Sequence, residues 1–168
     1  MPLPSYSPAV SMRELIKMDD DEVAAYLAGS VRARVATVGK DGSPHVVPMS
    51  YVVLDGNIAF WADNVSQKMV NLQRDPRVSV IIDDGMDFQE LRGVQVTGNA
   101  TLHADEETNG RIADLFALMA PEEHREAAKT MLLSLAAERT AVVVHPTRVS
   151  SWDHRKLGGG ARAQDLGH

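Results

Sequence analysis

Two features repeat in the first half of the chain: stretches of alternating apolar and polar residues, and Asp-Gly pairs between them. Residues 32–38 alternate in this way, as a strand with one buried face does. Asp-Gly pairs stand at 41–42, 55–56 and 84–85, and such pairs supply the positive φ angles that tight hairpin turns require. Alternation closed by these turns constrains the chain to antiparallel hairpins and therefore to a mainly β fold.

The same patterns predict six strands and four short helices along the chain. Helices do not alternate with strands in the first half, so a parallel α/β sheet is not expected. Closure into a barrel removes exposed strand edges, and we therefore expect an antiparallel, Greek-key-like, six-stranded barrel that is closed or nearly closed. The expected strands are 32–38, 45–54, 57–62, 77–83, 91–103 and 140–152, and the expected helices are 19–28, 66–74, 106–119 and 122–137.

Length and composition limit the classes of protein to consider. The 168 residues fit one domain, expected at 18–156, between an N-terminal arm (1–17) and a C-terminal tail (157–168). The absence of cysteine excludes a disulfide framework, a thiolate nucleophile and a cysteine-based metal site. A formal net charge of -6 gives little electrostatic support for nucleic-acid binding. The sequence shows neither a secretory signal nor an apolar stretch of ~20 residues, so no membrane segment and a cytoplasmic location are expected.

The helix that begins near Ser66 differs from the other three, which open with carboxylates. It opens with Asn64 and Ser66 as candidate caps, followed by Gln67 and Lys68, and a cation is unfavourable at the positive end of a helix dipole. Free backbone N–H groups, a hydroxyl and an ammonium would converge there on a phosphate. The alternative is a lysine on an ordinary solvated surface, and this feature alone leaves both interpretations open.

Three further features are ambiguous when taken singly. Pro48 within a predicted strand indicates an edge or a bulge with free backbone groups, but also fits a plain core strand with an edge proline. Trp61 and Trp152 offer large rings to stack on a planar ligand, yet such residues more often fill a core or an interface. The polar and cationic segment 151–156 suits either a phosphate contact or an ordinary terminal segment. The six histidines are scattered, so no metal site is assigned.

The order of these features resembles a known family. The run 33–38, Asp41-Gly42-Ser43-Pro44, Val47-Pro48-Met49 and 58–62 is followed by Ser66-x-Lys68-x-x-Asn71-Leu72-x-Arg74-Asp75-Pro76-Arg77-Val78. Together they resemble the pyridoxamine-phosphate-oxidase-like, flavin-binding split-barrel superfamily over residues 18–155. The segment Ser151-Trp152-Asp153-His154-Arg155-Lys156 is similar to the actinobacterial subgroup that uses the deazaflavin coenzyme F420.

The resemblance implies a homodimer with two cofactor sites at the subunit interface. It implies that the cofactor ring lies along the second and third strands and that the cofactor phosphate lies at the helix near Ser66. Trp152 and Arg155 are carried over from the C-terminal segment. The cofactor-binding residues implied in this way are Val46, Val47, Pro48, Met49, Ser50, Trp61, Ala62, Ser66, Gln67, Lys68, Asn71, Trp152 and Arg155.

The resemblance implies an F420-dependent reductase that transfers hydride to a planar unsaturated acceptor such as an enone, a quinone or a tetrapyrrole like biliverdin. An FMN-dependent oxidoreductase of the same fold is the first alternative, and a non-enzymatic haem- or cofactor-binding protein is the second. The basic C-terminal signature that grips pyridoxal phosphate is missing, so vitamin B6 oxidation is not expected. No catalytic side chain is assigned, because such a cofactor carries the hydride chemistry while the protein binds and orients.

Overall fold

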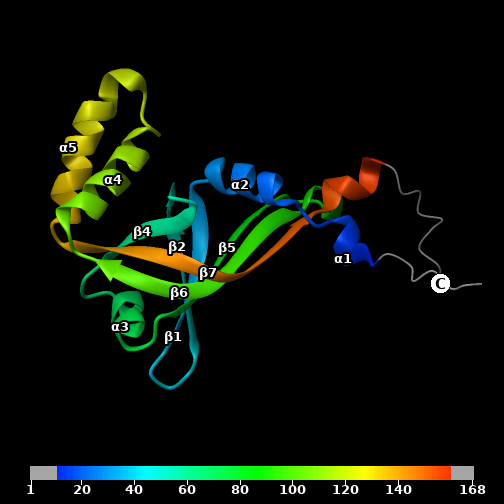
Figure 1. The fold of residues 1–168 in the computed structure, drawn as a ribbon, viewed down its shortest axis with the longest axis horizontal. Coiled ribbons are helices and arrows are strands. Elements are labelled where there is room, and N and C mark those ends of the chain that lie inside the picture. The colour runs from blue at the N-terminus through cyan, green and yellow to red at the C-terminus, as the bar shows by residue number, and fades with distance from the viewer. Residues whose placement is uncertain (1–10, 160–168) are drawn as a thin grey trace, which may run out of the picture.

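The computed structural model describes residues 11–159, and the outer parts of the expected arm and tail (1–10 and 160–168) lie outside the described residues (Figure 1). The described part of the arm contains a short helix, α1 (Met12–Leu15), and the chain after the last strand forms a 3-10 helix, η3 (His154–Gly159). Between them lies one curled antiparallel sheet with short helices, which confirms the mainly β prediction. No helix within 11–159 combines the length and the apolar character needed to cross a bilayer.

The sheet has seven strands, one more than the sequence predicted. Its order is β2-β1-β5-β6-β7-β4-β3, and every neighbouring pair is antiparallel. The strands are β1 (Arg32–Val38), β2 (Pro44–Ser50), β3 (Val52–Leu54), β4 (Asn57–Asp63), β5 (Arg77–Asp84), β6 (Arg92–His103) and β7 (Arg139–Asp153).

The additional strand arises because the segment predicted as one strand, 45–54, is divided at Tyr51. Before Tyr51 the chain runs along one edge of the sheet as β2, and after it the chain joins the opposite edge as β3. The two edges must lie close together for this to happen, so the sheet curls into a half-barrel. Tyr51 is fully buried at the crossing, and its hydroxyl donates to the carbonyl of Leu27 at 2.7 Å. The split barrel is therefore closed by the chain itself at this point.

The Asp-Gly pairs provide positive φ angles, as expected. Gly42, Gly56 and Gly85 have φ angles of 85°, 78° and 99°. Asp55 also has a positive φ of 50°, so the Asp55-Gly56 pair forms the two-residue hairpin between β3 and β4. The loops that contain Gly42 and Gly85 are longer, and the second of them includes the short 3-10 helix η1 (Phe88–Glu90).

Helices cover both sides of the curled sheet. Inside the barrel, valines from β1, β5, β6 and β7 pack with residues of α2 (Asp20–Ala28) and α3 (Gln67–Arg74). A capping box between Asp19 and Glu22 fixes the start of α2. Outside the barrel, α4 (Glu106–Ala117) and α5 (Arg125–Ala136) form a hairpin joined through η2 (Glu122–His124), and it packs on β3, β4 and β7 (Figure 1). The sheet therefore has two separate apolar clusters, one on each face.

Candidate functional site

The start of α3 is held by the loop that follows β4. The Asp63 carboxylate accepts from the N–H of Val65 at 3.0 Å, and the Asp63 carbonyl accepts from the Ser66 hydroxyl at 2.7 Å. Asn64 accepts from the Thr140 hydroxyl at 2.6 Å. Ser66 occupies the N-cap position, but no side chain caps α3. The caps predicted at Asn64 and Ser66 therefore do not form, because both side chains bond elsewhere.

The uncapped start of α3 retains donors for an external acceptor. The N–H groups of Gln67 and Lys68 lie in the first turn, where no side-chain oxygen accepts from them. Lys68 is half-buried, and among residues 11–159 it takes part in no ion pair. An ammonium, two amide N–H groups and the positive end of the helix dipole thus lie at one place, and this combination suits an anion.

Asn71 anchors α3 to the barrel. It is fully buried, its Nδ2 donates to the Thr37 hydroxyl at 3.0 Å, and its Oδ1 accepts from Gln67 Nε2 at 2.9 Å. The structure therefore brings Gln67 and Asn71 together as expected. The amide of Asn71 faces β1 and not the surface, so in this chain it holds the helix that carries Lys68.

The β2 residues of the predicted site face two ways. Val46, Pro48 and Ser50 are on the outer face of the curled sheet, where Val46 is 57% exposed, whereas Val47 and Met49 point toward the barrel. β2 is an edge strand, in agreement with the edge position that Pro48 predicts. The outer face continues onto β1, where Arg34 lies opposite Pro48. An exposed apolar strip thus runs beside basic groups.

Trp61 and Ala62 lie in the interior. Trp61 is 6% exposed, its Nε1 donates to Asn109 Oδ1 at 2.7 Å, and its ring centroid is 5.4 Å from that of Phe116. Ala62 faces the other way, into the barrel core. In the described chain Trp61 fills the space between β4 and α4, so the core role that the sequence left open is the one seen.

The C-terminal end of β7 carries the remaining predicted residues. A Cβ atom added to Gly93 would lie 2.3 Å from Trp152 Cζ2, so the indole covers the backbone of β6 closely at this point. Arg155 donates to both oxygens of buried Asp153, at 2.9 and 2.7 Å, and Arg92 donates to the same carboxylate at 3.1 Å. The hydrogen bonds from Arg155 hold the pKa of the Asp153 carboxyl below its usual range, although burial opposes this. Two guanidinium groups therefore share one buried carboxylate at this end of β7.

The predicted site has two halves, one at the start of α3 and one at the C-terminal end of β7, and these do not meet within one chain. The start of α3 follows the end of β4, which pairs with the beginning of β7, whereas Trp152 lies near the end of β7. β7 has 15 residues, so its ends are up to about 45 Å apart along an extended strand. Figure 1 accordingly shows α3 and the η3 end of the chain on opposite sides of the molecule.

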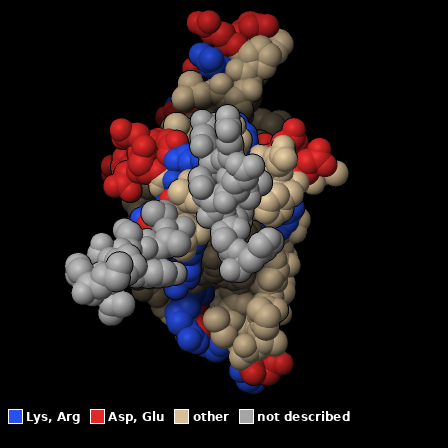
Figure 2. All heavy atoms as spheres, turned by 90° about the vertical axis from the view of Figure 1, so that its right-hand side faces the viewer, with Lys and Arg blue, Asp and Glu red and all other residues tan. Residues whose placement is uncertain are grey.

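The outer surface near the end of β7 mixes both signs of charge. Figure 2 views the molecule from this side: Lys and Arg groups gather in the lower half, and the larger Asp and Glu clusters lie higher, on both sides and at the top. On the sheet itself, a groove of about 240 Å³ crosses the outer face of β1, β5 and β6, and Arg77, Ser79 and Thr97 are among its lining residues. No local pattern indicates this groove, since it forms only where β1 pairs with the later strands β5 and β6.

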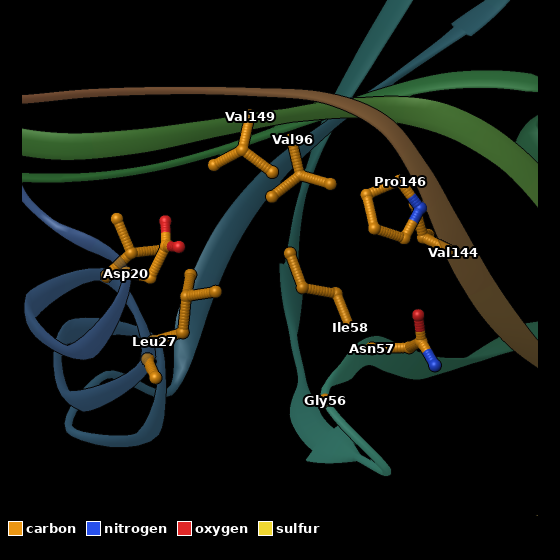
Figure 3. A pocket seen from close by; sticks show the side chains of 11 residues that line it. Asp20, Leu27, Gly56, Asn57, Ile58, Val96, Val144, Pro146 and Val149 are labelled. Carbon is orange, nitrogen blue, oxygen red and sulfur yellow. The ribbon is translucent and has the colours of Figure 1, made fainter.

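A different cavity, of about 230 Å³, opens at the mouth of the barrel (Figure 3). Its walls come from α2, from the turn between β3 and β4, and from β6 and β7, and they are mostly apolar. Asp20 is the single ionisable group among its lining residues, which are otherwise Val23, Ala24, Leu27, Gly56, Asn57, Ile58, Val96, Val144, Pro146 and Val149. None of the predicted site residues lies in it.

Comparison with known proteins places the chain in a family. It is 28% identical over 148 residues to the 5a,11a-dehydrotetracycline/5a,11a-dehydrooxytetracycline reductase of Streptomyces rimosus, covering 84% of this chain and 88% of the reductase. The crystal structure of the conserved hypothetical protein Rv2991 from Mycobacterium tuberculosis is similar with a TM-score of 0.80 and 35% identity, covering 92% of this chain and 96% of that one. A solved structure named F420 Reductase has a TM-score of 0.55 and 21% identity, covering 75% and 94%. The family model of pyridoxamine 5'-phosphate oxidase matches residues 19–153. The chain therefore belongs to the pyridoxamine 5'-phosphate oxidase family and has its split-barrel fold.

Proposed function

We propose that the protein is an F420-dependent oxidoreductase that acts as a homodimer and reduces a planar unsaturated small molecule. One observation carries the proposal: the start of α3 has no side-chain cap and holds Lys68, which has no ion pair within residues 11–159. Two relatives support the choice of chemistry, because one is named a dehydrotetracycline reductase and another an F420 reductase. FMN is the alternative cofactor for the same site.

The residues at α3 fit the phosphate of either cofactor. Lys68 and the N–H groups of the first turn would hold the anion, while the bonds from Gln67 through Asn71 to Thr37 keep the helix in place. When bound, the reduced coenzyme supplies the hydride. The chain's own contribution is to bind and orient the coenzyme and to shield it from water. The exposed apolar strip of Val46 and Pro48 offers a surface from which a flat ring would exclude water.

We propose a homodimer because the predicted site residues at the start of α3 and at the end of β7 lie far apart within one chain. An isologous contact places the same patch of each protomer on the other, and antiparallel packing of two outer sheet faces would bring α3 of one protomer toward Trp152 of the partner subunit. Each dimer would then have two equivalent sites, and each site would need both chains.

Titration separates the cofactor alternatives. F420, FMN and haem are added separately to the purified protein, and binding is followed by fluorescence and absorbance. We expect saturable F420 binding that Lys68→Ala weakens about tenfold or more, since a charge-assisted hydrogen bond contributes about 1.5–3 kcal/mol. Lys40→Ala, which removes an exposed lysine from the loop between β1 and β2, is the matched control. Equal affinity in the two variants would refute the phosphate assignment, and tighter binding of FMN would select the alternative cofactor.

Co-expression of two variants tests the shared site. Lys68→Ala and Trp152→Ala should each bind the coenzyme weakly as homodimers. In a mixed dimer one site carries both substitutions and the other carries neither, so about one quarter of all sites should regain normal affinity. A monomer by light scattering, or no recovery in the mixture, would contradict the arrangement.

A further inference from the structure

A cavity of about 620 Å³ lies between the helical hairpin and the sheet, beside the loop that leads into α3 and away from the barrel mouth. Its volume falls within the range of about 300–1,000 Å³ that small-molecule sites occupy. One wall is apolar and comes from Leu133, Ala136 and Ala137 at the end of α5, together with Ala104. The opposite wall is polar and comes from the beginning of β7 and from the loop before α3, so the cavity is amphipathic.

Gly110 leaves space in this cavity. It is the fifth residue of α4, and its φ is not among the positive values, so the backbone does not require a glycine there. A Cβ atom added to it would meet nothing within 4 Å, so close packing does not require one either. Glycine inside a helix is less favourable than alanine. The helix thus has a residue that weakens it at a position beside the cavity, and the space that a side chain would fill there stays open.

The polar wall offers donors to an anion. Arg139 takes part in no ion pair within the described chain, whereas Lys129 is paired with Asp114 at 2.5 Å. Asn64 accepts the hydroxyl of Thr140 through its Oδ1, which leaves its Nδ2 to donate. Glu106 is the one carboxylate among the lining residues, and it is exposed on the first turn of α4. Arg139 and Asn64 together suit a carboxylate.

We propose that this cavity binds a small amphipathic carboxylate, with its charged end on Arg139 and Asn64 and its apolar body along Leu133 and over Gly110. The site is independent of the cofactor proposal, because it shares none of the residues assigned to phosphate binding. The ligand class follows from three features of the cavity. Arg139 has no ion pair within the described chain, Asn64 has a free Nδ2 group, and the apolar wall lies beside the open space at Gly110.

Trp61 provides a built-in reporter of binding. Its Nε1 donates to Asn109, and Asn109 lines the cavity. The chain has two tryptophans, so Trp152→Phe leaves Trp61 as the single emitter. Octanoate is titrated into this variant, and octanamide of the same length serves as the uncharged control. We expect a saturable change in Trp61 emission with octanoate and at least tenfold weaker binding of octanamide.

Three substitutions in this background define the site. Arg139→Gln should weaken octanoate at least tenfold, and Arg148→Gln, which removes an exposed arginine of β7 outside the cavity, should leave the affinity unchanged. Glu106→Gln should tighten binding, because it removes the one opposing charge. Gly110→Leu should abolish binding while the melting temperature stays equal or rises, which separates a filled cavity from a failure to fold. Absence of saturable octanoate binding, or an affinity that neither Arg139→Gln nor Gly110→Leu changes, would overturn the proposal.

Discussion

Replacement of Asn71 by leucine tests how α3 is held against the barrel. Asn71 is fully buried, and its Nδ2 donates to the hydroxyl of Thr37, which is itself only 2% exposed. Leucine has the same branching at Cγ but a larger volume, so the substitution opens no cavity; it removes the amide and adds some crowding. The hydroxyl of Thr37 then loses its donor in a place that water does not reach.

The expected cost follows from that burial. A buried group that loses its hydrogen-bond partner costs about 1–3 kcal/mol, so Asn71→Leu should lower the free energy of unfolding by about 2 kcal/mol. Thr37→Val leaves the Nδ2 of Asn71 without an acceptor and should cost a similar amount. In the double variant both polar partners are gone and the contact is apolar. We therefore expect a total loss of about 2–3 kcal/mol instead of 4, which is a coupling energy of about 1–2 kcal/mol.

Urea unfolding of the four proteins measures this cycle, with equal m-values as the check that only stability changes. For a chain of this size each kcal/mol lowers the melting temperature by about 2–4 °C. Gln73→Leu, on the exposed side of the same helix, is the control and should change stability by less than about 0.5 kcal/mol. If the loss in the double variant equals the sum of the two single losses to within about 0.5 kcal/mol, the hydrogen bond between Asn71 and Thr37 is not what anchors α3.

Three further predictions test other parts of the fold. Burial raises the pKa of Tyr51 to about 12, whereas an unfolded tyrosine titrates near ~10. The contribution of Tyr51 to stability should therefore be constant below about pH 10 and fall by up to about 2.7 kcal/mol between pH 10 and 12, and urea midpoints of Tyr51→Phe should show a fall smaller by that amount. Gly93→Ala should displace the Trp152 ring, costing about 1–3 kcal/mol in urea unfolding, and a stability equal to wild type would show that the ring does not press on β6. Gly110→Ala should raise the free energy of unfolding by about 0.5–1 kcal/mol, and a decrease in thermal unfolding would show that the space beside α4 is not open.

Local patterns were enough to predict most strands and helices, because alternation, Asp-Gly turns and helix caps act over a few residues. The helix expected from residue 19 begins there, held by a capping box, and the turn at Asp55-Gly56 is formed as expected. The break at Tyr51 had no such signal, since tyrosine is a good strand former and alternation runs through it. What divides that strand is the curvature of the whole sheet, which brings β2 and β3 to opposite edges.

The contrast between features set by neighbouring residues and features set by the whole fold also applies to the predicted site residues. The start of α3 is a local feature, and the structure has an uncapped helix with Lys68 there, while anion binding at this place stays a prediction. The burial of Trp61 depends on α4, whose Asn109 and Phe116 follow it by about fifty residues in the chain. No pattern around Trp61 distinguishes a ring that stacks on a ligand from one that packs under a helix. Arg139 and Gly110 were missed for the same reason, because the cavity exists only once the hairpin folds back.

Each half of the proposed cofactor site is fixed by contacts that do not involve the cofactor. Asn71 and Thr37 hold α3, and Asp153 holds Arg155 through two hydrogen bonds. A site assembled from such pre-set halves loses little further side-chain entropy when its ligand binds, so more of the contact energy appears as affinity. It follows that dimer formation, and not rearrangement within a chain, would complete the site. Coenzyme affinity should then fall when the protein is diluted below its dimerisation constant, whereas a site built within one chain would bind equally well at any dilution.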